Sequence, residues 1–227
     1  MPNSYVVSSD GVRTAYDVAG TGPPMLLLHG FSHDRTMWAR AGWVERLRAE
    51  FTVITADLRG CGASDKPSTP DAYSLAAHLD DLATILRAVD RERCIVWGWS
   101  LGATIALHLA ARVDLVATVA AGTYFGPIFT ADYVERRRNA TRNVLQRARW
   151  SGLESWPAVE PEQVRGPLLL YSGTRDGNVV RVLERQRRSI EAVGAALQVL
   201  DGLDHLDLVA AVEPVAAVVM PFVRAAA

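Results

Sequence analysis

The sequence predicts an α/β protein in which helices cover both faces of a mostly parallel sheet. Short apolar runs alternate along the chain with stretches in which apolar residues recur every three or four positions. Strands that alternate with helices in this way are typical of βαβ units. The runs are apolar at every position, which indicates strands buried on both faces, as in a parallel sheet.

The predicted elements follow one another at short intervals. An antiparallel hairpin is expected at the edge of the sheet, because residues 5–7 and 12–18 flank the turn Ser9-Asp10-Gly11. Six apolar runs predict the other strands: residues 25–28, 51–56, 94–97, 115–120, 168–171 and 196–200. Helical periodicity predicts the helices: residues 37–50, 75–89, 103–111, 131–149 and 179–193, and an Ala/Val-rich helix that closes the chain. Ser74 precedes the second of these helices and is expected to cap it.

The composition indicates one globular domain over residues 1–227, with 49% hydrophobic and 22% charged residues. The formal net charge of −1 gives no reason to expect nucleic acid or an anionic membrane as a partner. The two cysteines do not suggest a disulfide framework, and residues 1–20 lack the pattern of a signal peptide, so we expect a cytoplasmic protein. We expect a monomer or small homo-oligomer that binds a small-molecule substrate.

One short stretch carries the main chemical signal. Gly98-Trp99-Ser100-Leu101-Gly102 lies between the apolar run 94–97 and the apolar helix 103–111. A strand, a Gly-x-Ser-x-Gly turn and a helix form the layout of a nucleophile elbow, in which a strained turn projects a serine hydroxyl. Glycine is needed two residues before and after the serine, because side chains there would collide across the turn.

Several chemistry-bearing residues directly follow predicted strands. Phe31, Ser100, Asp176 and His205 come from distant parts of the chain, yet each lies just after an apolar run. Ligands of open α/β sheets bind at the carboxyl ends of the strands. We therefore expect these four residues to lie on one rim of the sheet.

With these motifs the chain resembles the α/β-hydrolase superfamily, in its single-domain branch with a Ser-His-Asp triad. Three turns carry the resemblance, which extends over nearly the whole chain: Gly98-Trp99-Ser100-Leu101-Gly102, His29-Gly30-Phe31 and Asp57-Leu58-Arg59-Gly60-Cys61-Gly62-Ala63-Ser64. The resemblance implies the α/β-hydrolase fold, with the triad in the chain order Ser, Asp, His. Many relatives carry a large helical cap between two late strands, whereas this chain has only residues 123–166 there, which implies a short helical lid.

The resemblance also implies a role for each residue of the site. Ser100 is the expected nucleophile, His205 the base that accepts its proton, and Asp176 the acid that orients the histidine. The backbone N–H groups of Phe31 and Leu101 are expected to form the oxyanion hole.

Other polar and aromatic residues near these motifs are weaker candidates. Asp204 and Asp207 flank His205 and are alternative candidates for the acid of the triad, but residues so close in sequence rarely reach the ring nitrogen of the histidine with good geometry. Asp57 and Arg59 are expected to fix a turn behind the site rather than to act in catalysis. Four residues are candidates for contact with substrate, although tryptophan in particular is more often a core residue: His33, Trp38, Trp99 and Trp150.

The predicted helix 131–149 is rich in arginine and includes Arg137 and Arg142. Two interpretations of these arginines stay open. They form the solvated basic face of an amphipathic helix, or some of them select an anionic substrate.

Taken with the resemblance, the sequence predicts a serine hydrolase that cleaves carboxylic esters of small to medium acyl chains through an acyl-enzyme on Ser100. The same triad also suits hydrolysis of lactones, thioesters or C–C bonds, and a ligand-binding receptor without turnover is a further alternative on this fold. The serine argues against the dehalogenase and epoxide-hydrolase branches, which place an aspartate at that position. Neither a cofactor nor a metal is expected, because the sequence has no HExxH, paired CxxC or dinucleotide fingerprint.

Overall fold

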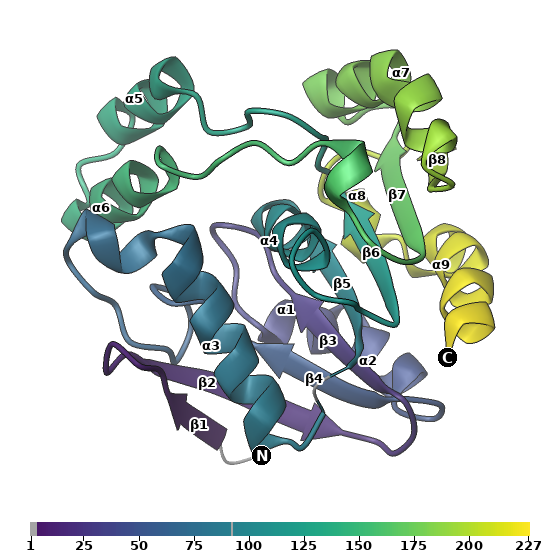
Figure 1. The fold of residues 1–227 in the computed structure, drawn as a ribbon, viewed down its shortest axis with the longest axis horizontal. Coiled ribbons are helices and arrows are strands. Elements are labelled where there is room, and N and C mark those ends of the chain that lie inside the picture. The colour runs from purple at the N-terminus through teal and green to yellow at the C-terminus, as the bar shows by residue number, and fades with distance from the viewer. Residues whose placement is uncertain (1–3, 92) are drawn as a thin grey trace.

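The structure, a computed structural model, describes residues 4–91 and 93–227. These residues form an eight-stranded sheet with the order β1-β2-β4-β3-β5-β6-β7-β8 (Figure 1). Its strands are β1 (Ser4–Val7), β2 (Arg13–Ala19), β3 (Pro24–Leu28), β4 (Thr52–Ala56), β5 (Ile95–Trp99), β6 (Ala117–Ala121), β7 (Leu168–Gly173) and β8 (Ala196–Leu200). β2 pairs antiparallel with both β1 and β4, and all other pairings are parallel. The predicted parallel sheet with a hairpin at its edge is confirmed.

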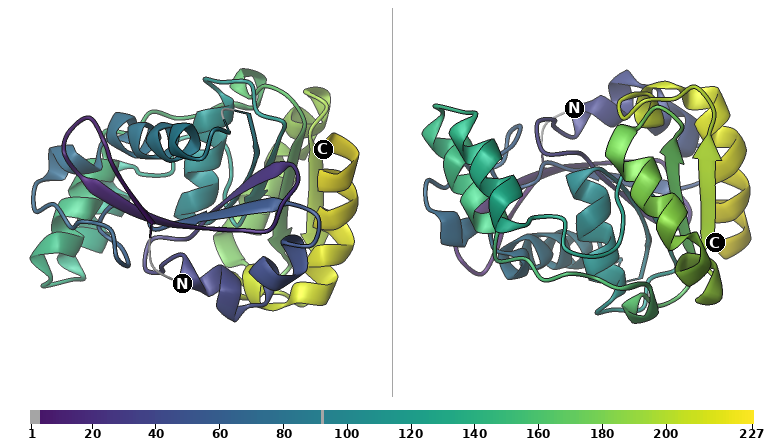
Figure 2. Two further views of the ribbon diagram at one scale, coloured as in Figure 1. Left: turned by 90° about the horizontal axis from the view of Figure 1, so that it is seen from below. Right: turned by 90° about the horizontal axis from the view of Figure 1, so that it is seen from above.

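Helices cover both faces of this sheet, as Figure 2 shows. One face packs against α1 (Thr36–Arg40), α2 (Trp43–Leu47), α8 (Asp207–Ala210) and α9 (Val212–Ala226). The opposite face packs against α3 (Leu75–Ala88), α4 (Leu101–Ala110) and α7 (Gly177–Ala192). Alternate residues of a strand point to opposite faces, so Met25 and Leu27 join the first core whereas Leu26 and Leu28 join the second. This division explains why the central strands are apolar at every position.

The centre of the molecule is the unit formed by β5 and α4. Every residue of β5 is buried, and so is every residue of α4, which packs against both β5 and β6. An apolar helix of this kind has no face left for solvent, in agreement with its sequence pattern. The turn between β5 and α4, at Ser100, therefore joins a strand and a helix that are buried along their whole lengths.

Two predicted helices are each divided in two. The stretch expected as one helix over 37–50 forms α1 and α2, because Gly42 takes a left-handed conformation with φ of 87° between them. The arginine-rich stretch expected as one helix over 131–149 forms α5 (Ala131–Asn139) and α6 (Val144–Leu153). Asn143 starts α6 as its N-cap, its side chain accepting a hydrogen bond from Gln146 N–H at 3.1 Å.

The segment between β6 and β7 contains α5, α6 and the short 3-10 helix η2 (Pro161–Gln163). α6 rests on a second 3-10 helix, η1 (Pro70–Tyr73), and the two approach so closely that a side chain at Gly152 would collide with Tyr73. α5 packs against α6 in turn. This arrangement holds the two helices over the carboxyl-terminal rim of the sheet, beside α4 (Figure 1).

The glycine-punctuated turn after β4 is fixed by buried ion pairs. Arg59 is fully buried, and its Nε and Nη2 donate to the two carboxylate oxygens of Asp81 at 2.7 Å each. Asp57 accepts hydrogen bonds from the Arg35 side chain and from Ala63 N–H. Both charged residues of the turn are thus committed to structure, as expected.

In the described part of the chain, no helix combines the length and apolar character needed to cross a membrane.

Candidate active site

Ser100 occupies a strained turn at the end of β5. Its φ of 56° and ψ of −117° lie outside the regions that residues with side chains normally adopt. Such conformations cost about 1–3 kcal/mol and persist only where the surroundings impose them. Here the Ser100 N–H donates to Ala121 O of β6 at 2.8 Å. A side chain at Gly98 would collide with Gly102, and one at Gly102 would collide with Leu28 O, so this turn accepts only glycine at both positions.

Asp176 and His205 form a hydrogen-bonded pair at the same rim. His205 Nδ1 lies 2.9 Å from Asp176 Oδ1, and Ser172 Oγ donates to the other carboxylate oxygen at 2.8 Å. The carboxylate is 6% exposed, whereas the imidazole is 36% exposed. An ionised carboxylate can only accept, so Nδ1 carries the proton of this hydrogen bond. The other ring nitrogen, Nε2, is therefore left to accept a proton when the imidazole is neutral.

The loops that carry this pair are joined by backbone hydrogen bonds. Thr174 N–H donates to Leu200 O at 2.9 Å, and Arg175 N–H donates to Leu203 O at 3.0 Å. A side chain at Gly173 would collide with Leu203, so the close approach of the two loops depends on this glycine. The pairing of β7 with β8 thereby continues past the strands and brings the loop of Asp176 to the loop of His205.

The turn His29-Gly30-Phe31 passes beside the serine. A side-chain carbon on Gly30 would lie 3.2 Å from Ser100 Cβ, which shows how near the backbone of this turn comes to the elbow. His29 is buried; its Nε2 accepts from Leu58 N–H at 3.0 Å, and its Nδ1 donates to Gly30 O at 2.7 Å. Burial lowers the pKa of His29 to about 4, so it is a neutral structural residue. Arg149 Nη2 donates to Phe31 O at 2.6 Å and holds the far side of the turn.

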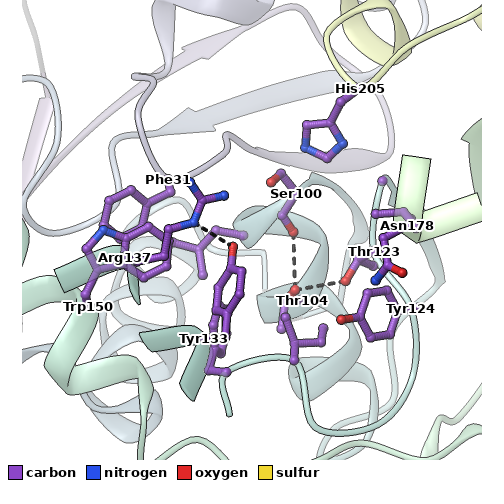
Figure 3. Close-up of a pocket in the computed structure, with 15 residues that line it drawn as sticks. Phe31, Ser100, Thr104, Thr123, Tyr124, Tyr133, Arg137, Trp150, Asn178 and His205 are labelled. Carbon is purple, nitrogen blue, oxygen red and sulfur yellow. Dashed lines mark hydrogen bonds between the residues drawn. The ribbon is translucent and has the colours of Figure 1, made fainter. Parts of the chain in front are cut away.

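A cavity of about 360 Å³ opens at these residues. Ser100 and His205 both line it, and the imidazole faces the Ser100 side chain across it (Figure 3). Among the described residues no hydrogen bond joins the side chains of Ser100 and His205. The other lining residues come from the turns after β3 and β6 and from α4, α5, α6 and α7: Phe31, Leu101, Thr104, Gly122, Thr123, Tyr124, Ile128, Phe129, Tyr133, Arg137, Trp150, Asn178 and Val179.

The four candidates for substrate contact have different positions. Trp150 lines the cavity and stacks on Phe31, with ring centroids 3.9 Å apart. Trp38 is fully buried against Trp97 in the core and does not line the cavity. Trp99 is also buried; its indole N–H donates to His205 O at 2.8 Å, so it supports the histidine from behind. His33 packs edge-on against Trp99 and is not part of the cavity wall.

The sequence analysis did not identify the contacts that three residues make around this cavity. Gly122 lies beneath His205, Arg149 binds the Phe31 carbonyl, and Tyr133 receives a hydrogen bond from Arg137 Nε at 3.2 Å. The positive φ of 65° at Gly122 has a sequence signal, since glycine directly after a strand indicates a special turn. The contacts of Arg149 and Tyr133 depend on how α5 and α6 pack, which no local pattern indicates. Within residues 4–91 and 93–227, no three His, Cys, Asp or Glu side chains are grouped closely enough to hold a metal ion.

Comparison with known proteins agrees with this architecture. Residues 23–132 match the model of a family described by the alpha/beta hydrolase fold. A thermophilic esterase from Thermogutta terrifontis, with malate bound, superposes with a TM-score of 0.85 at 22% identity, covering 100% of this chain and 99% of that one. A fluoroacetate dehalogenase from Burkholderia sp. is 34% identical over 163 residues, and a 2-(acetamidomethylene)succinate hydrolase from Mesorhizobium japonicum is 38% identical over 130 residues. These matches cover 69% and 56% of this chain but 51% and 45% of the two relatives, so the chain matches about half the length of each.

The chain therefore has the α/β-hydrolase fold over its whole length, and residues 23–132 match the α/β-hydrolase family model.

Proposed function

We propose that this chain is a serine hydrolase that cleaves carboxylic esters with small to medium acyl groups. One observation carries the proposal. Ser100, on its strained turn, shares a cavity with His205, whose Nδ1 is held 2.9 Å from a buried Asp176 carboxylate. A serine hydroxyl is a weak nucleophile, and a base that a third group orients is what activates it.

Each step of the proposed reaction uses groups of this chain. Ser100 Oγ attacks the ester carbonyl carbon, while His205 Nε2 accepts the hydroxyl proton and Asp176 stabilises the resulting imidazolium. The tetrahedral oxyanion accepts hydrogen bonds from Phe31 N–H and Leu101 N–H. Leu101 is the first residue of α4, so its N–H has no acceptor within the helix, which supports its proposed role as an oxyanion donor.

Collapse of this intermediate breaks the bond to the alcohol, which leaves with the proton from His205. Water is the nucleophile of the second step: it attacks the acyl-enzyme carbonyl and gives a proton to His205. Breakdown of the second intermediate returns that proton to Ser100 Oγ and releases the carboxylic acid. The proton count of the enzyme is therefore the same before and after one turnover.

The identity of the nucleophile favours acyl transfer over displacement at saturated carbon. Relatives of this chain include a fluoroacetate dehalogenase and an epoxide hydrolase from Xenopus tropicalis, which is 33% identical over 113 residues. Attack of a serine on saturated carbon would leave an ether, which water does not hydrolyse under the same catalysis. Attack on an ester carbonyl leaves an acyl-serine, which water does hydrolyse with the help of the same base. Ser100 therefore supports an ester substrate.

The cavity supports a small substrate. Its volume of about 360 Å³ is near the lower end of the range for ligand sites. α5 and α6 contribute Tyr133, Arg137 and Trp150 to its wall, so residues 123–166 act in this proposal as a short lid over the acyl site. We treat residues 1–227 as one hydrolase domain.

The test is hydrolysis of p-nitrophenyl acetate, butyrate and octanoate by the wild type, Ser100→Ala and Asp176→Asn. We expect the wild type to turn over with a preference for the shorter chains. Ser100→Ala should lose nearly all activity, and Asp176→Asn should lose about 10³–10⁴-fold in kcat because the imidazole loses its orienting acceptor. Activity that survives in Ser100→Ala would refute the mechanism.

A fluorophosphonate probe separates the remaining alternatives. Labelling of Ser100 in a protein that hydrolyses none of these esters would mean that the triad acts on lactones, thioesters or C–C bonds instead. Absence of both labelling and hydrolysis would favour a ligand-binding protein on this fold.

A further inference from the structure

Arg137 introduces a positive charge into a cavity whose other lining residues are mostly uncharged, several of them aromatic. It lies on α5 and lines the same cavity as Ser100 and His205, toward which its side chain extends in Figure 3. No Asp, Glu or Lys is found among the described residues that form the cavity wall. Among these described lining residues, His205 is the one other residue with a basic side chain.

The guanidinium of Arg137 is held in place by aromatic residues rather than by an acid. Its Nε donates to Tyr133 Oη at 3.2 Å, and its carbon lies 5.2 Å from the Tyr133 ring centre and 5.6 Å from the Trp150 ring centre. No carboxylate in the described part of the chain forms an ion pair with it. The Nη1 and Nη2 groups, which together carry four N–H donors, therefore remain for a ligand.

A second arginine adds positive potential at the same wall. Trp150 stacks on Phe31 at 3.9 Å, and the guanidinium of Arg149 lies 4.0 Å from the Phe31 ring centre. Arg149, Phe31, Trp150 and Arg137 thus form a sequence of stacked groups with a cation at each end. Arg149 is buried behind the Phe31 turn and bonds to its carbonyl, whereas Arg137 is exposed to the cavity.

We propose that Arg137 binds a carboxylate of the substrate, so that the site prefers esters whose acyl part carries a second, anionic carboxyl group. The planar fork of a guanidinium matches the two oxygens of a carboxylate, and the aromatic neighbours fix the orientation of the fork before the substrate arrives. The small cavity restricts the acyl part to a short dicarboxylic acid. This inference rests on the proposed esterase function and names its substrate class.

The test compares two ethyl esters of matched shape. Monoethyl succinate carries the carboxylate, and ethyl 4-methylpentanoate replaces that group with an isopropyl group of similar shape. Hydrolysis of each is followed by titration of the released acid in the wild type, Arg137→Gln and Arg142→Gln. Arg142 is exposed, lies between α5 and α6, and does not line the cavity, so it controls for the loss of one positive charge.

We expect the wild type to prefer monoethyl succinate, with a KM that rises with salt concentration. Arg137→Gln should lower the ratio of kcat/KM for the anionic ester to that for the neutral ester about 5- to 20-fold, mainly through KM. Arg142→Gln should leave this ratio within about twofold of the wild type, because screening weakens a charge outside the cavity. Equal losses for both esters in Arg137→Gln would overturn the proposal, since they would mean that Arg137 only packs.

A binding measurement makes this test independent of catalysis. Glutarate, which cannot be hydrolysed, is titrated calorimetrically into the wild type, Ser100→Ala, Arg137→Gln and Arg142→Gln. Binding that is weakened only by Arg137→Gln supports the carboxylate site even if no ester is cleaved. Binding that Arg137→Gln leaves unchanged overturns this inference while leaving the esterase proposal intact.

Discussion

Gly122 lies directly beneath the imidazole of His205. A side-chain carbon on Gly122 would come within 2.8 Å of His205 Cε1 and 3.0 Å of His205 Nδ1. Gly122 follows β6 immediately and has a φ of 65°, a left-handed conformation that disfavours other residues. The position of the histidine over the rim of the sheet therefore depends on the absence of a side chain at Gly122.

Gly122→Ala should impair catalysis by displacing His205. A displacement on the order of 1 Å is enough to cost about 100-fold in rate, so we expect kcat for p-nitrophenyl butyrate to fall by about that factor. The unfavourable φ should also lower the free energy of unfolding by about 1–2 kcal/mol. The matched control is Gly194→Ala, because Gly194 has a φ of 78° and open space around its Cα. That variant should lose similar stability, measured by urea unfolding, and retain wild-type kcat; a normal kcat in Gly122→Ala would contradict the argument.

Arg149 offers a second test of the proposed mechanism, in which it would position the turn that carries Phe31. It is buried, its Nη2 donates to Phe31 O at 2.6 Å, and its guanidinium lies 4.0 Å from the Phe31 ring centre. In Arg149→Met the turn loses this hydrogen bond, so the Phe31 N–H should no longer be fixed in the position that the proposed oxyanion hole requires. For the neutral ester p-nitrophenyl butyrate we expect kcat to fall at least about tenfold with little change in KM. The reason is that an oxyanion donor acts mainly in the transition state.

Three further measurements separate positioning by Arg149 from a purely structural role. Arg149→Lys keeps one donor and should recover part of kcat. Arg147→Met removes an exposed arginine of the same helix, whose side chain donates only to Arg138 O among the described residues, and should leave kcat and KM within about twofold. If Arg149→Met lowers the free energy of unfolding but not kcat, Arg149 serves stability alone.

The sequence predicted those parts of the site that depend on local geometry. Gly98 and Gly102 are required because the elbow brings each of them against nearby backbone, and this requirement is visible in the spacing of the motif. Asp176 and His205 each follow an apolar strand, and parallel strands bring such residues to one edge. The strands themselves were predictable because burial on both faces leaves continuous apolar runs.

Features that depend on packing between distant segments were not predictable in this way. The sequence does not indicate that Trp38 packs in the core against Trp97 whereas Trp150 stacks on Phe31 at the cavity. The break between α5 and α6 had a local signal in Asn143, a residue type that favours N-caps, but the arginine-rich periodicity continues through it. The role of Gly122 follows only from the position of His205, which is 83 residues later in the sequence.

The ion pair of Arg59 with Asp81 predicts a large loss of stability without a catalytic effect. Arg59 is fully buried and Asp81 is 2% exposed, and two hydrogen bonds of 2.7 Å join them. Asp81→Asn leaves a buried guanidinium without its main counter-charge, which should lower the free energy of unfolding by about 3–5 kcal/mol. The adjacent Asp80, whose side chain accepts from Ser9 N–H at 2.8 Å near the surface, is the control, and Asp80→Asn should cost about 1 kcal/mol. Urea unfolding measures both, and kcat per folded molecule should match the wild type in each variant, as neither residue lines the cavity.

The acid sensitivity of the fold should depend in part on His78. This residue is buried in α3, its Nδ1 donates to Ser74 O at 3.0 Å, and burial lowers its pKa to about 3. In the unfolded chain a histidine has a pKa of about 6.5, so between these two values the unfolded state binds more protons than the folded state. The stabilising effect of the neutral imidazole is therefore complete above about pH 6.5 and is lost as the pH falls toward 3.

His78→Gln tests this dependence, since the glutamine amide can still donate to Ser74 O but does not titrate. One such histidine makes the free energy of unfolding about 2 kcal/mol lower at pH 5 than at pH 7. The difference between urea unfolding at pH 7 and pH 5 should therefore be about 2 kcal/mol smaller in His78→Gln than in the wild type, whatever the variant costs at pH 7. His29 and His108, whose pKa values burial lowers to about 4, keep the same sign of dependence in both proteins. An identical loss in the wild type and His78→Gln would mean that His78 is already protonated in the folded protein at pH 5.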